Sequence, residues 1–117
     1  MARILVVDDE PDIRFLMRLI FEGAGHLVIE ARHGGSGWAS VKIARPDLVI
    51  TDMMMPTMGG QEFITRLRSD PETATIPILV VSGNSELATA ADVRLRKPFL
   101  APELLRVASL LIREDGR

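Results

Sequence analysis

Residues 48–52 read Leu-Val-Ile-Thr-Asp, an apolar run that starts after Pro46-Asp47 and ends at an acid, Asp52. A strand that is covered on both faces of a parallel sheet is apolar along its whole length, whereas in a strand with one solvent-exposed face apolar and polar residues alternate. The runs Ile4–Val7 and Ile78–Val81 have the same uninterrupted apolar character. These three runs therefore predict the central strands of a parallel sheet with helices on both faces.

Segments with helical spacing separate the predicted strands. The expected strands are Ile4–Val7, Leu27–Ile29, Leu48–Ile50, Ile78–Val81 and Val93–Arg96, and the expected helices begin at Pro11, at Gly34, before Phe63 and at about Pro102. On the second helix we expect Trp38, Val41 and either Ile43 or Ala44 to face the core. This alternation predicts a doubly wound α/β domain, in which ligands bind beyond the carboxyl ends of the strands.

Length and composition narrow the class of protein further. A chain of 117 residues is expected to form one domain, residues 1–117, with no output domain after the last helix. A net charge of -2 argues against a nucleic-acid binder, and no apolar stretch is long enough to span a membrane. The absence of cysteine excludes disulfides, thiol catalysis and cysteine-based zinc sites. We therefore expect a cytoplasmic globular domain.

Polar residues follow the predicted strands at their carboxyl ends. Asp8 and Asp9 follow the first strand, Asp52 the third, Ser82 the fourth and Lys97 the fifth. Taken singly, each has an ordinary structural explanation, as a helix cap, a loop acid or a surface cation. Together they share one edge of a doubly wound sheet, which makes a common site the better explanation.

The residue types in this set suit phosphoryl transfer assisted by a metal ion. Three carboxylates, Asp8, Asp9 and Asp52, repel one another unless a cation joins them, and oxygen ligands of this kind suit Mg²⁺. A carboxylate can also attack phosphorus and form an aspartyl phosphate. A lysine and a hydroxyl, here Lys97 and Ser82, would stabilise the charge on the transferring group.

Four motifs in this order resemble those of the response-regulator receiver domain of two-component signalling. They are Val6–Glu10, Thr51–Gly60, Val80–Gly83 and Lys97–Phe99, and the resemblance covers essentially the whole chain. It implies a flavodoxin-like parallel sheet in the strand order 2-1-3-4-5. In such a sheet ligands bind beyond the carboxyl ends of the strands, at the point where the strand order reverses.

The resemblance also implies roles for individual residues at this site. Asp52 would be the phosphoacceptor, and Mg²⁺ would be bound by Asp8, Asp9 and Asp52, with Asp9 the more direct ligand of the acidic pair. The backbone carbonyl of Met54 would be a further metal ligand.

The hydroxyl and the lysine complete the roles that the resemblance implies. Ser82 would follow the phosphoryl group and Lys97 would pair with it. The implied partners are a histidine kinase or a histidine phosphotransferase and a separate downstream protein, with no nucleic acid and no membrane. The protein would be a monomer or a weak dimer.

The chain departs from the receiver pattern after Ser82. Receiver domains usually carry an aromatic residue where this chain has Arg94, so the usual aromatic switch is not expected. Only residues 83–92, ten in number, separate Ser82 from Val93, and a parallel crossover generally needs about a dozen or more. We therefore expect a shortened or unwound fourth helix, and a Gly83–Ala91 segment that becomes reordered on phosphorylation.

The fifth strand differs from the others in its pattern. Val93 and Leu95 alternate with Arg94 and Arg96, and two arginines are costly to bury unpaired. One face of this strand is therefore expected to meet solvent.

Two other functions remain open from the sequence. One is a magnesium-dependent phosphatase that acts through Asp52, although such enzymes usually have a second acid where this chain has Met54. The other is a scaffold that keeps the fold without being phosphorylated, which the unusual Arg94 permits.

Overall fold

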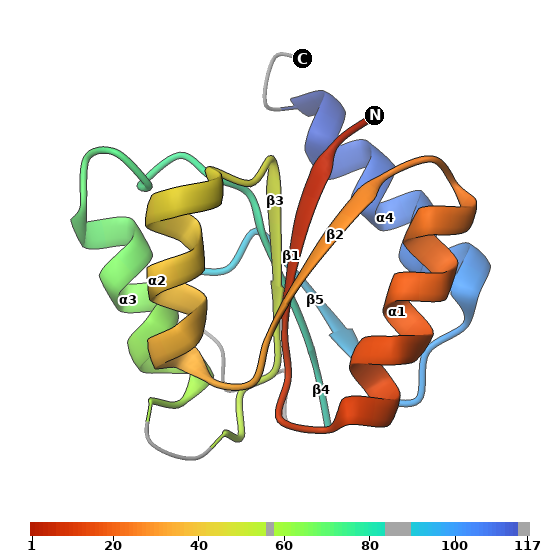
Figure 1. The fold of residues 1–117 in the computed structure, drawn as a ribbon, viewed down its shortest axis with the longest axis horizontal. Coiled ribbons are helices and arrows are strands. Elements are labelled where there is room, and N and C mark those ends of the chain that lie inside the picture. Colours follow the sequence, from red (N-terminus) through yellow and green to blue (C-terminus); the bar gives the residue numbers. More distant parts are fainter. Residues whose placement is uncertain (56–57, 84–89, 115–117) are drawn as a thin grey trace.

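A parallel sheet of five strands lies at the centre of the structure, a computed structural model that describes residues 1–55, 58–83 and 90–114 (Figure 1). The strands are β1 (Arg3–Val7), β2 (Leu27–Ala31), β3 (Leu48–Thr51), β4 (Ile78–Ser82) and β5 (Val93–Arg96). Their order is β2-β1-β3-β4-β5, and every neighbouring pair is parallel. The predicted fold class and strand order are therefore confirmed.

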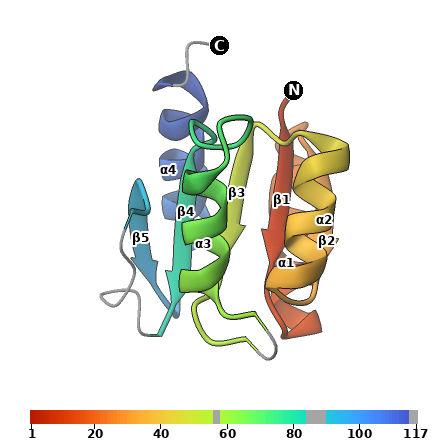
Figure 2. The same ribbon diagram turned by 90° about the vertical axis from the view of Figure 1, so that its left-hand side faces the viewer.

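Helices cover both faces of the sheet, as Figures 1 and 2 show. The helices of the described residues are α1 (Pro11–Gly23), α2 (Gly34–Ala44), α3 (Gly60–Ser69) and α4 (Ala101–Glu114). One face packs against α1 and α4, and the other against α2 and α3. None of these helices is long and apolar enough to cross a membrane.

Covering both faces explains why the central strands are apolar throughout. Along β1, Ile4 and Val6 pack in the core on the α1 and α4 side, while Leu5 and Val7 pack on the α2 and α3 side. All four side chains are at most 1% exposed. An alternating strand would have placed polar groups in one of these two cores, at a cost in desolvation.

The buried face of α2 agrees with the prediction, and Ala44 rather than Ile43 is the residue turned inward. Val41 is buried, and Trp38 and Ala44 are half-buried. Ile43 is 85% exposed. The helix turns Gly37 toward the sheet, where a Cβ would lie 3.0 Å from a methyl group of Val7. Because a small residue marks this close approach, the apolar side chains alone could not decide between Ile43 and Ala44.

Strand β5 has one apolar and one polar face, as its alternation predicts. Val93 and Leu95 pack against the core shared with α1 and α4, whereas Arg94 and Arg96 are exposed. Residues 84–89 lie outside the described residues. The expectation of a shortened fourth helix, and of reordering in Gly83–Ala91, falls largely on them.

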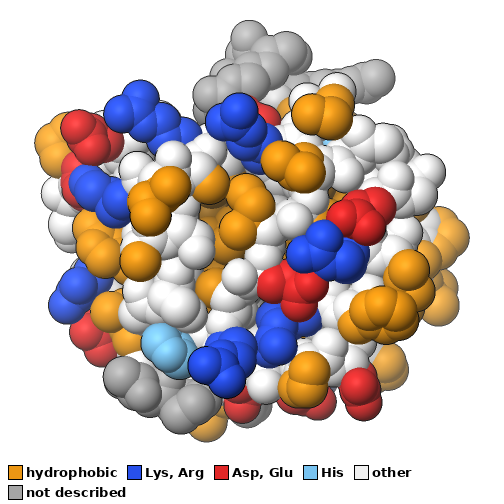
Figure 3. Space-filling model, in the orientation of Figure 1, with side chains coloured by type: hydrophobic (Ala, Val, Ile, Leu, Met, Phe, Trp, Pro, Cys, Tyr) orange, Lys and Arg blue, Asp and Glu red, His pale blue; other side chains and the backbone are white. Residues whose placement is uncertain are grey.

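Acidic and basic side chains are interspersed on the face drawn in Figure 3. Lysine and arginine side chains there lie among acidic and apolar ones rather than in one continuous basic area. This distribution agrees with the small net charge of -2.

Candidate functional site

The register of the sheet brings the predicted acids to one edge. Val7 is the partner of Thr51 in the pairing of β1 with β3, so the residues that follow, Asp8 and Asp52, leave the sheet side by side. The backbone N–H of Asp52 donates to the carbonyl of Val7 at 3.0 Å. This is the carboxyl edge of the strands, at the bottom of Figure 1.

Four carboxylates gather at this edge. Asp8, Asp9, Glu10 and Asp52 each offer an oxygen, and these oxygens all lie within 4.8 Å of one another. Asp8 and Asp52 are only 1% and 6% exposed, whereas Asp9 and Glu10 are exposed. Such a concentration of hard oxygen ligands, part buried and part open to solvent, suits Mg²⁺, which keeps several of its waters. The residues present therefore fit the predicted metal.

Lys97 is the cation that enters this cluster. Its backbone N–H donates to the carbonyl of Ser82 at 3.2 Å, which fixes the start of the loop after β5. Its Nζ donates to Asp8 Oδ2 at 2.9 Å, to Asp52 Oδ2 at 3.2 Å and to Glu10 Oε1 at 3.3 Å. One ammonium group thus donates hydrogen bonds to three carboxylates.

The pKa values of Lys97 and Asp8 are both raised, for different reasons. Burial alone would lower the pKa of Lys97, but the hydrogen bond and charge of Asp8, with the charge of Asp52, raise it well above its ordinary value. Burial raises the pKa of Asp8, and the backbone N–H of Glu10 and the ammonium of Lys97 offset this only in part. For Lys97 the surrounding anions outweigh burial, whereas for Asp8 burial outweighs the ammonium group that it shares.

Asp52 is held by the loop that follows β3. Its Oδ1 accepts a hydrogen bond from the backbone N–H of Met53 at 2.7 Å and a longer one from Met54 at 3.4 Å. A Cβ at Gly60 would overlap the carbonyl oxygen of Asp52 and lie 2.7 Å from the Cα of Met53. The absence of a side chain at Gly60 therefore lets α3 begin directly against this loop.

The other two predicted site residues lie at the same edge of the sheet. Ser82 ends β4, the strand beside β3, and is 1% exposed. Met54 follows Asp52 in the loop, and its side chain is 63% exposed. The structure thus brings Asp8, Asp9, Asp52 and Lys97 together, and places Ser82 on the neighbouring strand.

Two residues near the site were not predicted. Glu10 belongs to the carboxylate cluster and contacts Lys97, and its position directly after the acidic pair is the signal that could have identified it. Arg14 donates from Nη1 to the carbonyl of Asp8 at 2.8 Å. Nothing in the sequence pattern distinguishes Arg14 from an ordinary surface residue of a helix.

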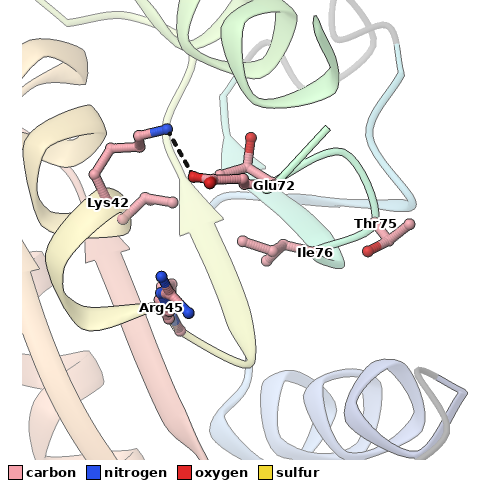
Figure 4. Close-up of a pocket in the computed structure, with 8 residues that line it drawn as sticks. Lys42, Arg45, Glu72, Thr75 and Ile76 are labelled. Atoms are coloured by element: carbon pink, nitrogen blue, oxygen red, sulfur yellow. Dashed lines mark hydrogen bonds and ion pairs between the residues drawn. The ribbon is translucent and has the colours of Figure 1, made fainter. Parts of the chain in front are cut away.

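A separate cavity of about 320 Å³ lies at the opposite, amino edge of the strands (Figure 4). It is formed between the end of α2, at Arg45, and the segment that precedes β4, at Thr75 and Ile76. Lys42 pairs there with Glu72 at 3.2 Å. None of the predicted site residues lines this cavity, so it is separate from the carboxylate cluster.

Comparison with known proteins agrees with this geometry. Residues 4–107 match the family model described as the response regulator receiver domain. The chain is 38% identical over 123 residues to the DNA-binding dual master transcriptional regulator RpaA of Synechocystis, covering 98% of this chain and 51% of that protein. It is 39% identical over 82 residues to Protein PilH of Pseudomonas aeruginosa, covering 70% of this chain and 68% of that protein. The chain therefore spans about half the length of RpaA.

Solved structures show the same fold. The signal receiver domain of a signal transduction histidine kinase from Syntrophus aciditrophicus superposes with a TM-score of 0.94 at 27% identity, covering 100% of this chain and 94% of that one. The chemotaxis response regulator CheY4 of Vibrio cholerae superposes with a TM-score of 0.88 at 31% identity, covering 95% and 98% of the two chains.

Proposed function

Because the chain belongs to the response regulator receiver domain family, we propose that it accepts a phosphoryl group on Asp52, with Mg²⁺ bound beside it, and signals through protein–protein contacts. Receiver domains are signalling modules of two-component systems. The observation that carries the proposal is the position of Asp52. This buried carboxylate follows an apolar strand and belongs to a cluster of four acids, and its Oδ2 lies 3.2 Å from Nζ of Lys97.

The proposed step is a phosphoryl transfer onto the Asp52 carboxylate. One carboxylate oxygen forms a bond to phosphorus, the bond between phosphorus and the donor breaks, and its electron pair leaves with the donor. Lys97 would pair with a phosphoryl oxygen, and the Ser82 hydroxyl would donate a hydrogen bond to another.

Asp8, Asp9 and Asp52, with the backbone carbonyl of Met54, are the proposed metal ligands. Glu10 offers a further carboxylate in the same cluster. Mg²⁺, when bound, supplies positive charge that offsets both the carboxylates and the oxygens of the transferring group.

The proposed chemistry ends with gain and loss of one phosphoryl group. A histidine kinase or a histidine phosphotransferase would supply the group, and a separate downstream protein would respond to it. The phosphatase alternative is disfavoured, because Met54 stands where such an enzyme has a second acid.

Labelling with acetyl phosphate tests the proposal. Intact mass should increase by one phosphoryl group in the wild type, and only when Mg²⁺ is present. Asp52→Asn should not be labelled, whereas Asp70→Asn, which changes an acid in the loop after α3, should be labelled like the wild type.

Each other result supports a competing account. Equal labelling of wild type and Asp52→Asn would reject Asp52 as the acceptor. A wild type that takes no label with Mg²⁺ would favour the scaffold, and steady turnover of phosphomonoesters would favour the phosphatase.

A further inference from the structure

A network of charged side chains joins α1 to β2. Arg14 and Arg18, one helical turn apart on α1, each donate from Nε to the carboxylate of Glu30 on β2, at 3.0 and 2.7 Å. Arg18 also donates to Glu22 at 2.7 Å. The two arginines are thus equivalent in their attachment to Glu30.

Arg14 has one contact that Arg18 does not share. Its Nη1 donates to the backbone carbonyl of Asp8 at 2.8 Å. Its side chain is also the more enclosed, at 13% exposed compared with 33% for Arg18. Arg14 therefore connects Glu30, in the sheet, with the peptide bond that joins Asp8 to Asp9.

This peptide bond sets the direction of Asp9. A peptide group is planar, so a hydrogen bond to the Asp8 carbonyl also orients the N–H and Cα of Asp9. Asp8 itself is fixed at its side chain, where Oδ1 accepts from the backbone N–H of Glu10 at 2.9 Å and Oδ2 accepts from Lys97 at 2.9 Å. Asp9 is exposed, so the preceding peptide, rather than side-chain packing, fixes the Cα from which its carboxylate extends.

The place of Arg14 in the helix supports a role beyond helix stability. Arg14 is the fourth residue of α1, near the end where the helix dipole disfavours a cation. Its guanidinium nevertheless reaches back toward that end to contact Asp8.

We propose that Arg14 is a positioning residue that holds the Asp8–Asp9 peptide so that the Asp9 carboxylate faces the cluster, and thereby strengthens Mg²⁺ binding. This inference rests on the metal site of the proposed function. Arg14 acts through the backbone of Asp8 and is not a ligand.

Two simpler roles for Arg14 predict different results. If Arg14 acted only as a positive charge near the carboxylates, its removal would tighten Mg²⁺ binding. If it acted only as a link between α1 and β2, removing Arg14 or Arg18 would have the same effect.

The test compares Arg14→Met with Arg18→Met, which loses the same partner on β2 but no contact to Asp8. Calorimetric titration should show Mg²⁺ binding about tenfold weaker in Arg14→Met, the lower end of the range for residues that orient a ligand, and within about twofold of wild type in Arg18→Met. Labelling by acetyl phosphate should need more Mg²⁺ in Arg14→Met but reach a similar rate at saturation. In the metal-free protein, amide hydrogen exchange at Asp9 should be faster in Arg14→Met alone.

Arg14→Lys keeps the charge but presents its three N–H donors from a single nitrogen rather than from a planar fork, so it should restore only part of the affinity. It also keeps the test decisive if circular dichroism shows that Arg14→Met is unfolded. Unchanged or tighter Mg²⁺ binding in the Arg14 variants, or equal weakening in the Arg18 variant, would overturn the inference. A wild type that neither binds Mg²⁺ nor takes label would instead count against the proposed function.

Discussion

Asp8 makes hydrogen bonds through all three of its oxygen atoms, whereas its neighbour Asp9 is exposed at the rim of the cluster. Oδ1 and Oδ2 of Asp8 accept from Glu10 and Lys97, and its carbonyl accepts from Arg14. An acid that is already bonded in this way has less freedom to take up a metal ion directly. The two adjacent acids are therefore expected to differ in importance.

Asp9→Ala should weaken Mg²⁺ binding by more than the roughly 10–100-fold typical of residues that only support a ligand, because the site loses a direct ligand and its charge. Asp8→Ala should weaken it less, since Asp8 is expected to act mainly through water. Calorimetric titration of both variants with Mg²⁺ measures the difference. Unchanged affinity in Asp9→Ala would argue that the metal does not bind here.

Lys97→Ala should not weaken Mg²⁺ binding but should abolish the response to phosphorylation. The ammonium of Lys97 is expected to pair with the phosphoryl group rather than with the cation. Backbone amide spectra with and without beryllofluoride measure that response, with Lys42→Ala, at the opposite edge of the sheet, as the control. A full spectral response in Lys97→Ala would contradict this role.

At the scale of the elements, the attachment of α1 to β2 depends on one acid. Burial alone would raise the pKa of Glu30, but the hydrogen bonds from Arg18 and Arg14 lower it below its ordinary value of 4.5. An acid with a lowered pKa stabilises the fold above its ordinary pKa, and this stabilisation is lost as the pH falls through the lowered value. The attachment of α1 should therefore be sensitive to acid.

Glu30→Gln should lower the free energy of unfolding by about 1 kcal/mol at neutral pH, a figure already reduced for solvent screening of partly exposed ion pairs. The difference from wild type should shrink as the pH falls below 4.5 and should be lost once the pH has fallen through the lowered pKa of Glu30. Urea unfolding over a pH series measures it, with Glu103→Gln on the exposed side of α4 as the control. A difference that is constant with pH would show that Glu30 does not act through its charge.

The elements differ in how well their sequences predicted them. The uninterrupted apolar runs predicted the central strands, and the alternation of β5 predicted its exposed arginines, because in both cases burial is set by the side chain itself. On α2 the sequence left open whether Ile43 or Ala44 faces the core, and the structure shows Ile43 exposed. The pattern could not decide because Gly37, rather than a large apolar residue, marks the face in contact with Val7. Arg14 could not be predicted, because its contact to Asp8 depends on the path of the backbone and not on residue type.

At the scale of the whole molecule, the site is a local excess of negative charge. Four carboxylates and one lysine are held together at one edge of a sheet, and the burial of Asp8 raises its pKa. A bound cation would reduce the repulsion among these acids, and a ligand that binds only the folded protein stabilises it.

Mg²⁺ should therefore raise the unfolding temperature of the wild type. At a concentration about 100 times the dissociation constant, the expected stabilisation is about 2.7 kcal/mol, which corresponds to a shift on the order of 10 °C for a domain of this size. Calorimetric scans at constant ionic strength measure this shift, and Asp9→Ala should show little of it. An equal shift in that variant would mean that Mg²⁺ stabilises the protein at another place.

The exposed arginines of β5 also bear on how the molecule behaves at high concentration. β5 is the last strand of the sheet, so one side of its backbone has no neighbouring strand within the described residues. Edges of this kind are templates for sheet extension and aggregation, which natural proteins suppress with short strands and charged side chains. Arg94 and Arg96 place two charges within a strand of four residues. The alternation of apolar residues and arginines that exposes one face of β5 to solvent therefore also protects the protein from polymerising through its edge strand.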